Sequence, residues 1–375
     1  MQTDVLIIGA SVAGLSTAAV LQKLGIPYTI LEKRDRVGAP WHEHYHRLHL
    51  HTSKRFSHLP YKKFPPDTPR YPSRRQVIDY LEDYRRTFGI NPRFDTEAAS
   101  ITREGGQWHT VTNNGDFRST HLVMATGAYS RPNPVEFKGI ETFPGKVLHS
   151  SQYKTGSEYK GRTVLVVGFG NSACEIAIDL YEQGATPVMS VRSPVNVVPR
   201  DVFGISVLEL SYLLSRLPPR VADRISGPLM KGLIGDLSKL GLERMPYGPL
   251  EAISRDGNPP VLDIGTIKHI RQGHITVRPG IDHLSGSTVV FRDGQRRSFD
   301  AIIAAIGYYR DYDKILHVDA VRFADLRLPA VKQKYFGADG LYFCGYWISP
   351  TGQFRCIASD ARLIGRHIAR HKAAP

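Results

Sequence analysis

Two glycine-rich loops, one beginning at Gly9 and the other at Gly168, constrain the fold of this chain more than any other feature. Each loop follows a short run of β-branched residues and precedes an Ala-rich stretch with apolar residues at helical spacing. This order is typical of a strand, a phosphate-binding turn and a helix, in which backbone N–H groups at the helix start face an anion. One such loop is a weak signal, but two predict that the chain binds two dinucleotides at once.

The first loop lies within a βαβ pattern whose elements we expect at residues 5–8, 13–24 and 28–31. Gly9 makes the tight turn and Gly14 allows close packing of helix on strand, while Ser11 stands where a glycine is usual. Serine is small and its hydroxyl can donate to phosphate, so we expect binding to survive. Glu32 follows the second strand about 20 residues after the first glycine and is expected to accept hydrogen bonds from an adenosine ribose. Lys33, beside it, is a further candidate contact.

The second loop repeats the pattern, with elements expected at residues 163–167, 173–183 and 188–191. Its candidate cofactor-binding residues are Gly168, Gly170, Asn171 and Ser172. The second strand is followed by Arg192 and Ser193 instead of an acid. An acid there would repel a 2′-phosphate, whereas a guanidinium binds one, so the sequence favours NADPH over NADH.

Charge and cysteine content narrow the class of protein further. The net charge is +14, but no run of five basic residues is present, so we expect no nucleic-acid partner. The three cysteines, Cys174, Cys344 and Cys356, are widely spaced and odd in number. They indicate a reducing, cytoplasmic setting and argue against a metal cluster or a redox disulfide.

Targeting and membrane segments are not expected. The first strand begins almost at once, at Val5, which leaves no room for a secretory leader. Residues 5–26 are apolar, but their glycines and serines fit a strand, turn and helix better than a transmembrane segment.

The residues between the two loops carry a family resemblance. Residues 143–153 read F-x-G-x-x-x-H-x-x-x-Y, which resembles the fingerprint of the class B flavin-dependent monooxygenases. Three later stretches, at 192–200, 248–251 and 260–265, are similar to the plant YUCCA-type flavin monooxygenases. The likeness runs from about residue 5 to about residue 370.

This resemblance implies an α/β fold with two Rossmann-like dinucleotide-binding domains. The FAD-binding domain would comprise residues 1–155 and 312–375. An NADPH-binding domain, at 156–311, would be inserted into it and carry a helical insertion at about 202–242. We expect the 143–153 string at the junction of the two domains.

The resemblance also implies the chemistry. NADPH reduces FAD, O₂ forms a C4a-(hydro)peroxyflavin, and one oxygen atom enters a small organic substrate. In the YUCCA branch this is the oxidative decarboxylation of an aryl α-keto acid such as indole-3-pyruvate. The alternatives are S- or N-oxygenation or Baeyer-Villiger oxidation of small xenobiotic-like substrates, and a non-catalytic flavin-binding protein. A disulfide reductase would need a cysteine pair near the flavin. The oligomeric state is open, a homodimer being one option.

Several site residues follow from the resemblance. Flavin contacts are implied for Trp41, for the A-T-G turn of Ala125, Thr126 and Gly127, and for Gln353 at the start of the last helix. Gly307, which ends a similar turn, is a further candidate cofactor-binding residue. Where the family often has G-D, this chain has Gly345-Tyr346. The loop near the isoalloxazine would supply the candidate catalytic residues His51, Thr52, Ser53 and Lys54. The cations considered for a substrate carboxylate are Lys54, Arg75 and Arg200.

A histidine-rich segment admits a second interpretation. His42-Glu43-His44-Tyr45-His46 matches H-E-x-x-H, a zinc signature that needs both end histidines on one helix. Residues 48–51 instead alternate like a strand, and the segment coincides with the flavin-edge loop of the family. We therefore expect no metal.

The segment 202–242 is the least regular, with apolar residues at helical spacing interrupted by Pro218 and Pro219. A roof over the substrate, an ordinary helical hairpin and a membrane-surface contact all fit it, because amphipathicity alone does not separate them.

Overall fold

The computed structural model describes the chain except for residues 129, 310–311, 318–336 and 374–375, and it divides into two compact units. Unit 1 comprises Met1–His42, Thr52–Arg131 and Tyr309–Pro375. Unit 2 comprises Glu43–His51 and Pro132–Tyr308.

These boundaries differ from those expected at 155/156 and 311/312. The chain enters unit 2 earlier because β7 (Lys146–His149) pairs in parallel with β18 (Ala301–Ala304), inside the unit 2 sheet. Residue 311 lies outside the described residues. The excursion of residues 43–51 into unit 2 was not expected from the sequence.

Unit 1 is built on a sheet with the order β2-β1-β5-β4-β3, to which β20 is added beside β5. Its strands are β1 (Gln2–Ile8), β2 (Tyr28–Leu31), β3 (Ala98–Glu104), β4 (Gln107–Thr112), β5 (Phe117–Met124) and β20 (Leu341–Phe343). The four strands β2, β1, β5 and β20 pair in parallel, while β3, β4 and β5 form an antiparallel meander. The carboxyl ends of the parallel strands therefore meet at one edge, where ligands bind in folds of this kind.

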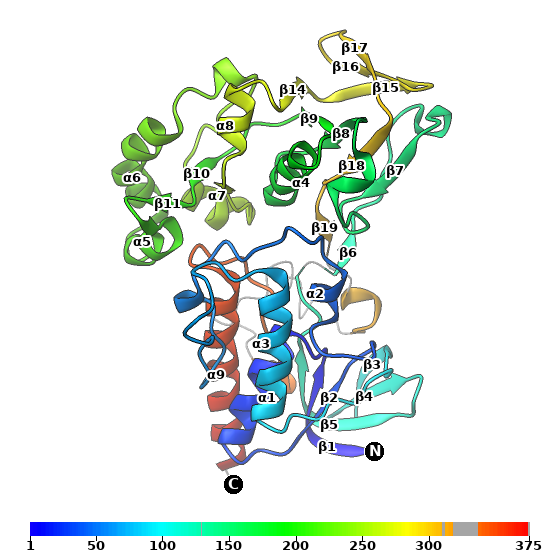
Figure 1. Ribbon diagram of the computed structural model, residues 1–375. Helices are drawn as coiled ribbons and strands as arrows, with labels where there is room; N and C mark the ends of the chain where they lie inside the picture. The colour runs from blue at the N-terminus through cyan, green and yellow to red at the C-terminus, as the bar shows by residue number, and fades with distance from the viewer. Residues whose placement is uncertain (129, 310–311, 318–336, 374–375) are drawn as a thin grey trace. The chain divides into compact units, whose positions relative to one another are not determined.

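Three helices pack together in unit 1, as Figure 1 shows: α1 (Val12–Lys23), α3 (Arg74–Thr87) and α9 (Gln353–Ala373). A Cβ at Gly365 would lie 2.5 Å from Cγ1 of Val20, so a glycine in α9 allows it to approach α1 closely. Helix α3 begins with a capping box between Ser73 and Gln76, a local signal that fixes its start.

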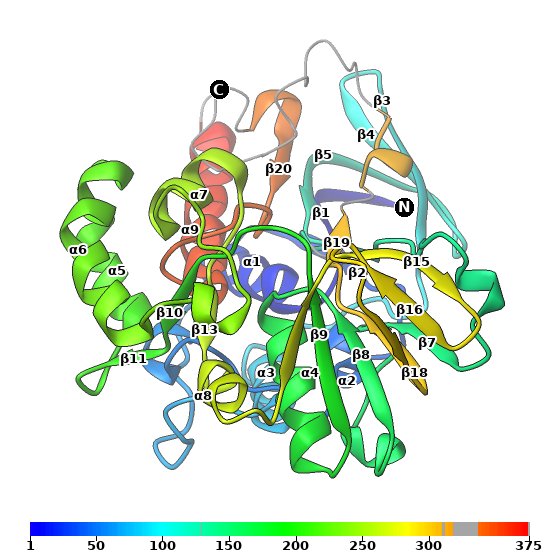
Figure 2. The same ribbon diagram turned by 90° about the horizontal axis from the view of Figure 1, so that it is seen from above.

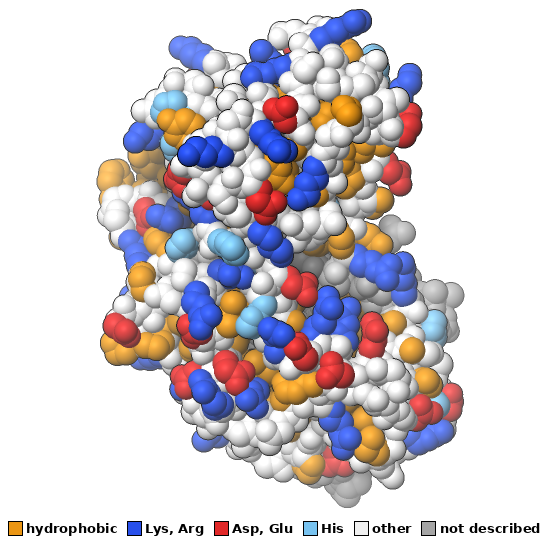
Figure 3. Space-filling view, turned by 45° about the vertical axis from the view of Figure 1, so that its right-hand side comes forward, with side chains coloured by type: hydrophobic (Ala, Val, Ile, Leu, Met, Phe, Trp, Pro, Cys, Tyr) orange, Lys and Arg blue, Asp and Glu red, His pale blue; other side chains and the backbone are white. Residues whose placement is uncertain are grey.

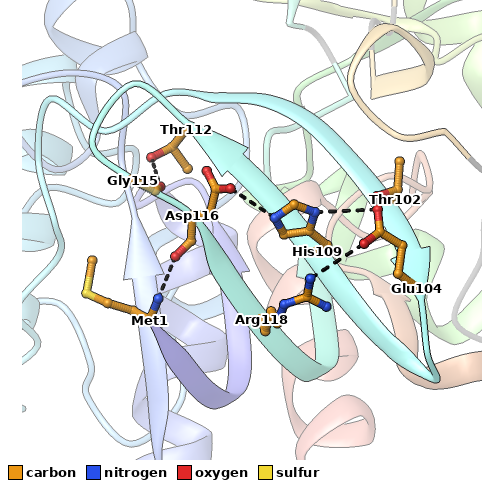
Figure 4. A network of polar contacts seen from close by, with 8 residues as sticks. All are labelled: Met1, Thr102, Glu104, His109, Thr112, Gly115, Asp116 and Arg118. Atoms are coloured by element: carbon orange, nitrogen blue, oxygen red, sulfur yellow. Dashed lines mark hydrogen bonds and ion pairs between the residues drawn. The ribbon is translucent and has the colours of Figure 1, made fainter.

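The meander of unit 1 carries a polar network at its surface (Figure 4). The ring of His109 lies between two carboxylates, 3.0 Å from Asp116 and 3.5 Å from Glu104, and Arg118 reaches Glu104 at 3.6 Å. Exposed pairs of this kind contribute little to stability. The buried cluster beneath them, which includes Trp108, accounts for more of it.

Unit 2 is built on a parallel sheet with the order β14-β9-β8-β18-β7. Figure 2 shows helix α4 beside this sheet. The strands not yet defined are β8 (Thr163–Val167), β9 (Thr186–Val191) and β14 (Thr276–Pro279), and α4 spans Asn171–Glu182. The three central strands, β9, β8 and β18, are buried as apolar runs, as expected for a parallel sheet covered on both faces.

Smaller elements complete unit 2. They are β10 (Val197–Pro199), β11 (Asp201–Val202), β12 (Ile205–Ser206), β13 (Val261–Asp263), β15 (Ile281–Ser285), β16 (Thr288–Phe291), β17 (Arg296–Ser298), α5 (Val207–Leu214), α6 (Pro219–Ile234), α7 (Pro249–Asp256) and α8 (Thr266–Arg271). Pro219 does not interrupt a helix but begins α6, at a position whose N–H would have no partner.

The remaining short elements include α2 (Ala39–Glu43), β6 (Arg131–Pro132), β19 (Tyr308–Tyr309), η1 (Lys54–Phe56), η2 (Ile140–Thr142), η3 (Gly156–Tyr159), η4 (Ser238–Leu240), η5 (Tyr312–Lys314) and η7 (Ala338–Gly340).

The two dinucleotide-type folds predicted from the sequence are confirmed, but the strand predicted at residues 48–51 is wrong. In that segment His49 forms a single β-bridge, and His51 is held by a side chain of α4, described below. No helix among the described residues is long and apolar enough to cross a membrane. On the face shown in Figure 3, Lys and Arg are spread among Asp and Glu and do not merge into one basic field.

Candidate functional site

The first glycine loop has no space for side chains. Gly9 has a φ of 103°, and a Cβ there would lie 2.8 Å from the carbonyl oxygen of Ala125. A Cβ at Gly14 would lie 1.8 Å from the Gly9 oxygen. Within the described part of the chain, Ser11 caps α1 without a side-chain hydrogen bond to the helix, so its hydroxyl is available to a ligand. The first N–H groups of α1 have no intrahelical partner, which makes the loop a row of donors suited to a phosphate.

Glu32 ends β2 with its carboxylate turned toward this loop. The residue is 7% exposed, and its two oxygens accept hydrogen bonds from the N–H groups of Ala10, at 2.8 Å, and Arg34, at 3.0 Å. A carboxylate held in this way is placed to accept from ribose hydroxyls. Lys33 points to the surface, where its ammonium lies 3.9 Å from Glu97.

The A-T-G turn follows β5 and closes onto a buried tyrosine. The N–H of Ala125 donates to Ile8 at 2.9 Å, and Gly127 adopts a φ of 89°. The Thr126 hydroxyl hydrogen bonds with the hydroxyl of Tyr346, which is fully buried. The tyrosine that follows Gly345 in this chain is therefore part of the turn that the resemblance assigns to the flavin.

The backbone of Gly345 is held from both sides by the last helix. Gln353 donates to its carbonyl oxygen at 2.7 Å, and Asp360 accepts from its N–H at 3.1 Å. Burial raises the pKa of Asp360 to about 7. This clamp fixes the turn that leads to the N-terminus of α9.

Thr52 and Ser53 lie beside the same helix start. A Cβ at Gly352 would lie 2.3 Å from the methyl carbon of Thr52, and Gly352 directly precedes α9. The Thr52 hydroxyl hydrogen bonds with Ser57 at 2.6 Å, and Ser53 is 3% exposed. The structure thus brings two of the four candidate catalytic residues to the end of α9 that the resemblance directs at the flavin.

Each cation considered for a substrate carboxylate already has a partner. Lys54 donates to two backbone carbonyls, at 2.7 and 2.6 Å, and so orders the loop that follows it. Arg75 pairs with Asp79 at 3.1 Å, and Arg200 pairs with Asp201 at 3.2 Å. An incoming carboxylate would have to compete with these contacts.

Trp41 packs edge-on against Phe354, with the ring centres 5.7 Å apart. Arg74 donates to the carbonyl oxygen of His42 at 2.9 Å and lies 3.5 Å from that of Trp41. The tryptophan therefore joins α2 to the first turn of α9 within unit 1.

The H-E-x-x-H pattern does not adopt the zinc geometry. Helix α2 ends at Glu43, so His42 and His46 do not lie on one helix. The described residues contain no group of three or more His, Cys, Asp or Glu that could hold a metal ion.

The second glycine loop repeats the shape of the first. Gly168 has a φ of 117°, and a Cβ there would lie 2.5 Å from the Ala305 oxygen. A Cβ at Gly170 would meet no described atom within 4 Å, so the backbone there is open to a ligand. The side-chain oxygen of Asn171 accepts from the N–H of Leu262 at 2.8 Å, and its side-chain nitrogen donates to the carbonyl oxygen of Pro260 at 3.4 Å. The YUCCA-like stretch at 260–265 therefore braces the loop.

Helix α4 presents a row of acids behind this loop, beginning with Glu175. Its side chain is 2% exposed, and one oxygen hydrogen bonds with Nε2 of His51. Burial, together with the Glu175 carboxylate, raises the pKa of Tyr45, whose hydroxyl hydrogen bonds with Glu175 and Ser172. His51 is thus held to unit 2, although Thr52, the next residue, belongs to unit 1.

The next two acids of α4 hold neighbouring segments. Asp179 accepts from the Tyr153 hydroxyl at 2.6 Å and from the N–H of Gly156 at 2.8 Å. Glu182 pairs with Arg47 at 2.8 Å. The acid row therefore fastens both the 43–51 excursion and the end of the fingerprint string.

The rest of the fingerprint string has equally specific contacts. Phe143 lies in a buried cluster, and a Cβ at Gly145 would lie 2.3 Å from the Asp300 oxygen. Nε2 of His149 lies 3.0 Å from the carbonyl oxygen of Gly307, and burial lowers the pKa of this histidine. Gly307 is thereby placed at the carboxyl end of the unit 2 sheet, and the string lies within unit 2.

Arg192 and Ser193 directly follow β9, as the sequence predicted, and both are exposed. The Arg192 side chain makes no hydrogen bond or ion pair with any other described residue. A Cβ at Gly280 would lie 2.8 Å from Cβ of Arg192 and 3.3 Å from Nε of Arg292. Two guanidinium-bearing residues therefore border one glycine.

Sequence reasoning missed Glu175, Asp360 and Arg292. For the two acids a signal existed, because each interrupts the apolar face of an otherwise regular helix. A charge at a buried helical position usually has a partner or a function. Arg292 gave no such signal, because its neighbour Arg192 is 100 positions away in the sequence.

The chain matches known proteins over most of its length. A family model described as pyridine nucleotide-disulphide oxidoreductase matches residues 6–202. The probable indole-3-pyruvate monooxygenase YUCCA3 of Arabidopsis thaliana is 38% identical over 378 residues, which cover 97% of this chain and 86% of that protein. The indole-3-pyruvate monooxygenase YUCCA6 of the same plant is 42% identical over 317 residues, which cover 82% and 76%.

Solved structures show the same fold. A flavin-containing monooxygenase from Stenotrophomonas maltophilia superposes with a TM-score of 0.73 at 20% identity, over 99% of both chains. Cyclohexanone monooxygenase with bound ε-caprolactone gives 0.74 at 17% identity, over 99% of this chain and 88% of that one. The bacillithiol disulfide reductase YpdA of Staphylococcus aureus gives 0.69 at 16% identity, over 99% of both.

Proposed function

The chain belongs to the YUCCA-type flavin-dependent monooxygenases, and from this premise we propose that it oxidatively decarboxylates an aryl α-keto acid such as indole-3-pyruvate, with FAD and NADPH as cofactors. The observation that carries the proposal is the pair of glycine loops in a chain of this family. Each loop has a first glycine whose Cβ would collide with a neighbouring backbone oxygen, as a nucleotide-binding turn requires.

Unit 1 fits FAD. The open hydroxyl of Ser11 and the first N–H groups of α1 suit a pyrophosphate, and the buried carboxylate of Glu32 suits a ribose. We propose that Thr126 and Gln353, which sit at the carboxyl end of β5 and the start of α9, border the flavin ring. The same assignment extends to Trp41, Ala125 and Gly127, and we propose that Lys33, beside Glu32, is a further contact to the FAD.

Unit 2 fits NADPH. The backbone at Gly170 is open, Asn171 is braced by the loop before β13, and Arg192 is unpaired among the described residues. We propose that Arg192 and Ser193 bind the 2′-phosphate, and that Ser172 and Gly307 border the coenzyme. A guanidinium matches the geometry of phosphate oxygens in a way that a hydroxyl-accepting acid does not.

The reaction we propose converts R–CO–COO⁻, O₂, NADPH and H⁺ into R–COO⁻, CO₂, H₂O and NADP⁺, so that atoms and charges balance. The reduced flavin supplies the O₂ chemistry, and the protein supplies binding, orientation and exclusion of water. Thr52 lies against Gly352 at the start of α9, and we assign Thr52 and its neighbour Ser53 to the reacting face. For His51 we propose a positioning role, because Glu175 engages its ring.

Lys54 is the cation that we assign to the α-keto acid, and its ammonium is shared between two backbone carbonyls. We propose that the substrate carboxylate takes over one of these contacts.

S- or N-oxygenation is not favoured, because YUCCA3 and YUCCA6, which are 38% and 42% identical to this chain, both carry the name indole-3-pyruvate monooxygenase.

Disulfide reduction is the activity suggested by the family-model description, but the cysteines do not support it. Cys174, Cys344 and Cys356 are free and buried. Burial raises the pKa of the Cys344 thiol, which disfavours the thiolate needed for exchange. Three reduced cysteines also favour a cytoplasmic location, which we propose on that ground.

The test is a product assay on the purified full chain supplied with FAD. We expect NADPH oxidation in the presence of indole-3-pyruvate to yield one arylacetate and one CO₂ per NADPH at best coupling. A thioether under the same conditions should give no sulfoxide above background. A chain that binds no FAD, or that oxygenates the thioether and leaves the keto acid intact, would overturn the proposal.

A further inference from the structure

A cluster of large apolar side chains is exposed on the helical segment of unit 2. We call it the apolar face, and its members are Phe203, Ile205, Leu213, Leu217, Val221, Ile225, Leu229 and Leu233. Their exposed fractions range from 40% to 84%. A soluble protein rarely concentrates this many large apolar side chains in one short segment unless they meet a partner.

The most exposed member stands at the tip of a hairpin. Phe203 is 84% exposed and has a φ of 49°, and it is followed by Gly204 with a φ of 77°. The two residues form the turn between β11 and β12, in which both central positions are left-handed. A bulky residue is uncommon in this conformation, and asparagine or glycine would serve the turn better. The turn therefore exposes the Phe203 ring to solvent although its backbone conformation is unfavourable for a bulky residue.

Helix α6 continues the apolar face with a regular stripe. Val221, Ile225, Leu229 and Leu233 are spaced by four residues, which places them along one side of the helix. Three other residues of the helix, Ala222, Met230 and Ile234, are buried. The helix thus has an inner apolar side that holds it to unit 2 and an outer one without a role in the fold.

A basic rim accompanies the apolar face. Between residues 203 and 233 the exposed charged side chains are Arg216, Arg220, Arg224 and Lys231. The two acids of this stretch are only partly exposed, and Asp223 is used to accept from the first N–H groups of α7. Arg220 pairs with Glu251 and yet remains 80% exposed. The segment therefore combines exposed apolar side chains with an excess of exposed cations.

We propose that the apolar face docks on an anionic lipid surface, with the hairpin tip and the stripe of α6 at the depth of the headgroups and acyl chain ends. Helices that lie in a membrane interface combine an apolar side with Lys and Arg at its border. Anionic headgroups complement the rim, and each cation near such a surface contributes binding. This association is peripheral and reversible.

Two other occupants fit the same surface less well. In a symmetric dimer built on this face, the rim of one copy would meet the equally cationic rim of the other. A roof over a substrate would direct its apolar side chains toward a pocket, whereas these eight are exposed to solvent.

The test is flotation of the purified, FAD-supplied full chain with vesicles. One set of vesicles contains phosphatidylcholine alone, and the other a mixture with phosphatidylserine. We expect binding to the mixed vesicles at low salt, weak binding to the neutral ones, and loss of binding as salt screens the rim.

Two double variants separate the contributions. Leu213→Gln with Ile225→Gln should lower partitioning roughly tenfold for each residue replaced. Arg216→Gln with Arg224→Gln should lower it roughly fivefold for each charge removed. The matched controls are Leu24→Gln, which alters an apolar residue of unit 1 that is 42% exposed, and Arg86→Gln with Arg296→Gln. These controls should float like the wild type.

Thermal unfolding of each variant shows whether it is folded, and the arginine pair carries the test if the apolar pair is destabilised. The proposal is overturned if the wild type does not float with mixed vesicles at low salt, or if the controls lose as much binding as the face variants. Light scattering that reveals a dimer dissolved by the apolar variants would assign the face to a second copy instead. A higher KM for the keto acid with unchanged flotation would assign it to the substrate.

Discussion

The coenzyme preference depends on Arg192, and its replacement by alanine offers the sharpest test of the nucleotide assignment. Its guanidinium is exposed and has no hydrogen bond or ion pair with another described residue, so no internal contact is lost in the variant. Gly280 lies against its Cβ, and the Nε of Arg292 approaches the same glycine. A 2′-phosphate at this edge would therefore meet two cations.

The size of the effect follows from these contacts. A hydrogen bond to a charged group contributes about 1.5–3 kcal/mol. Since water competes at an exposed side chain, we take the lower value, ~1.5 kcal/mol, which corresponds to about tenfold in kcat/KM. Arg192→Ala should lower the ratio of kcat/KM for NADPH over NADH by about tenfold. The change should lie in the KM for NADPH, with NADH nearly unaffected. Arg292→Ala should lower the ratio further when combined with it.

The assay is steady-state oxidation of each coenzyme, together with reduction of the bound flavin measured by stopped flow. Arg296→Ala is the matched control, because this exposed arginine lies on β17 and has no place in the proposed site. The reasoning is refuted if the wild type uses both coenzymes equally well, or if the ratio is the same in the Arg192 variant and the control.

Three further predictions concern the units separately. Gly9→Ala should abolish FAD binding, because the added Cβ would lie 2.8 Å from the Ala125 oxygen and the residue has a φ of 103°. The measurement is the flavin absorbance of the purified protein. Coenzyme binding to unit 2, followed by fluorescence, should persist. Tyr153→Phe should lower the free energy of unfolding in urea by about 2 kcal/mol, because the buried Asp179 carboxylate loses a donor; an unchanged midpoint would show that the bond is dispensable. Asp360 has a folded pKa raised to about 7, so its stabilising contribution is complete below the unfolded value near 3.8 and is lost as pH rises to about 7. Asp360→Asn should remove this loss, so that the variant gains stability over the wild type above neutral pH; equal pH profiles in chemical denaturation would contradict the assignment.

Local signals predicted the nucleotide loops well. The strands at Tyr28–Leu31 and Thr163–Val167 were placed with the bounds that the structure has. In each case the cause lies in a few adjacent residues: a β-branched run or a glycine that must turn. The same holds for Arg192, whose position after β9 follows from strand length alone.

Contacts between distant segments could not be predicted in this way. Residues 48–51 alternate like a strand, yet His51 at one end is bound by Glu175 on α4, and Arg47, just before the segment, is bound by Glu182. Both acids lie more than 120 positions later in the chain. The boundary between the units was predicted after residue 155 but lies before residue 132. This difference is also non-local, because the partner of β7 is β18, about 150 residues later in the chain. Arg292 lies beside Gly280, and Asp360 accepts a hydrogen bond from Gly345, but neither contact follows from the local sequence pattern. An alternating pattern identifies a strand only where a partner strand is available.

The contacts of the fingerprint string explain why a chain with this chemistry needs no acid–base set of its own. Tyr153 donates to a carboxylate of α4, His149 lies beside the Gly307 carbonyl, and Gly145 admits the backbone that leads into β18. Each of these residues positions a backbone turn or strand end in unit 2. If the cofactors carry the redox chemistry, the protein's task is to hold such turns within a few tenths of an ångström. Replacing a fingerprint residue should therefore alter coenzyme affinity and stability before it alters the pH dependence of turnover.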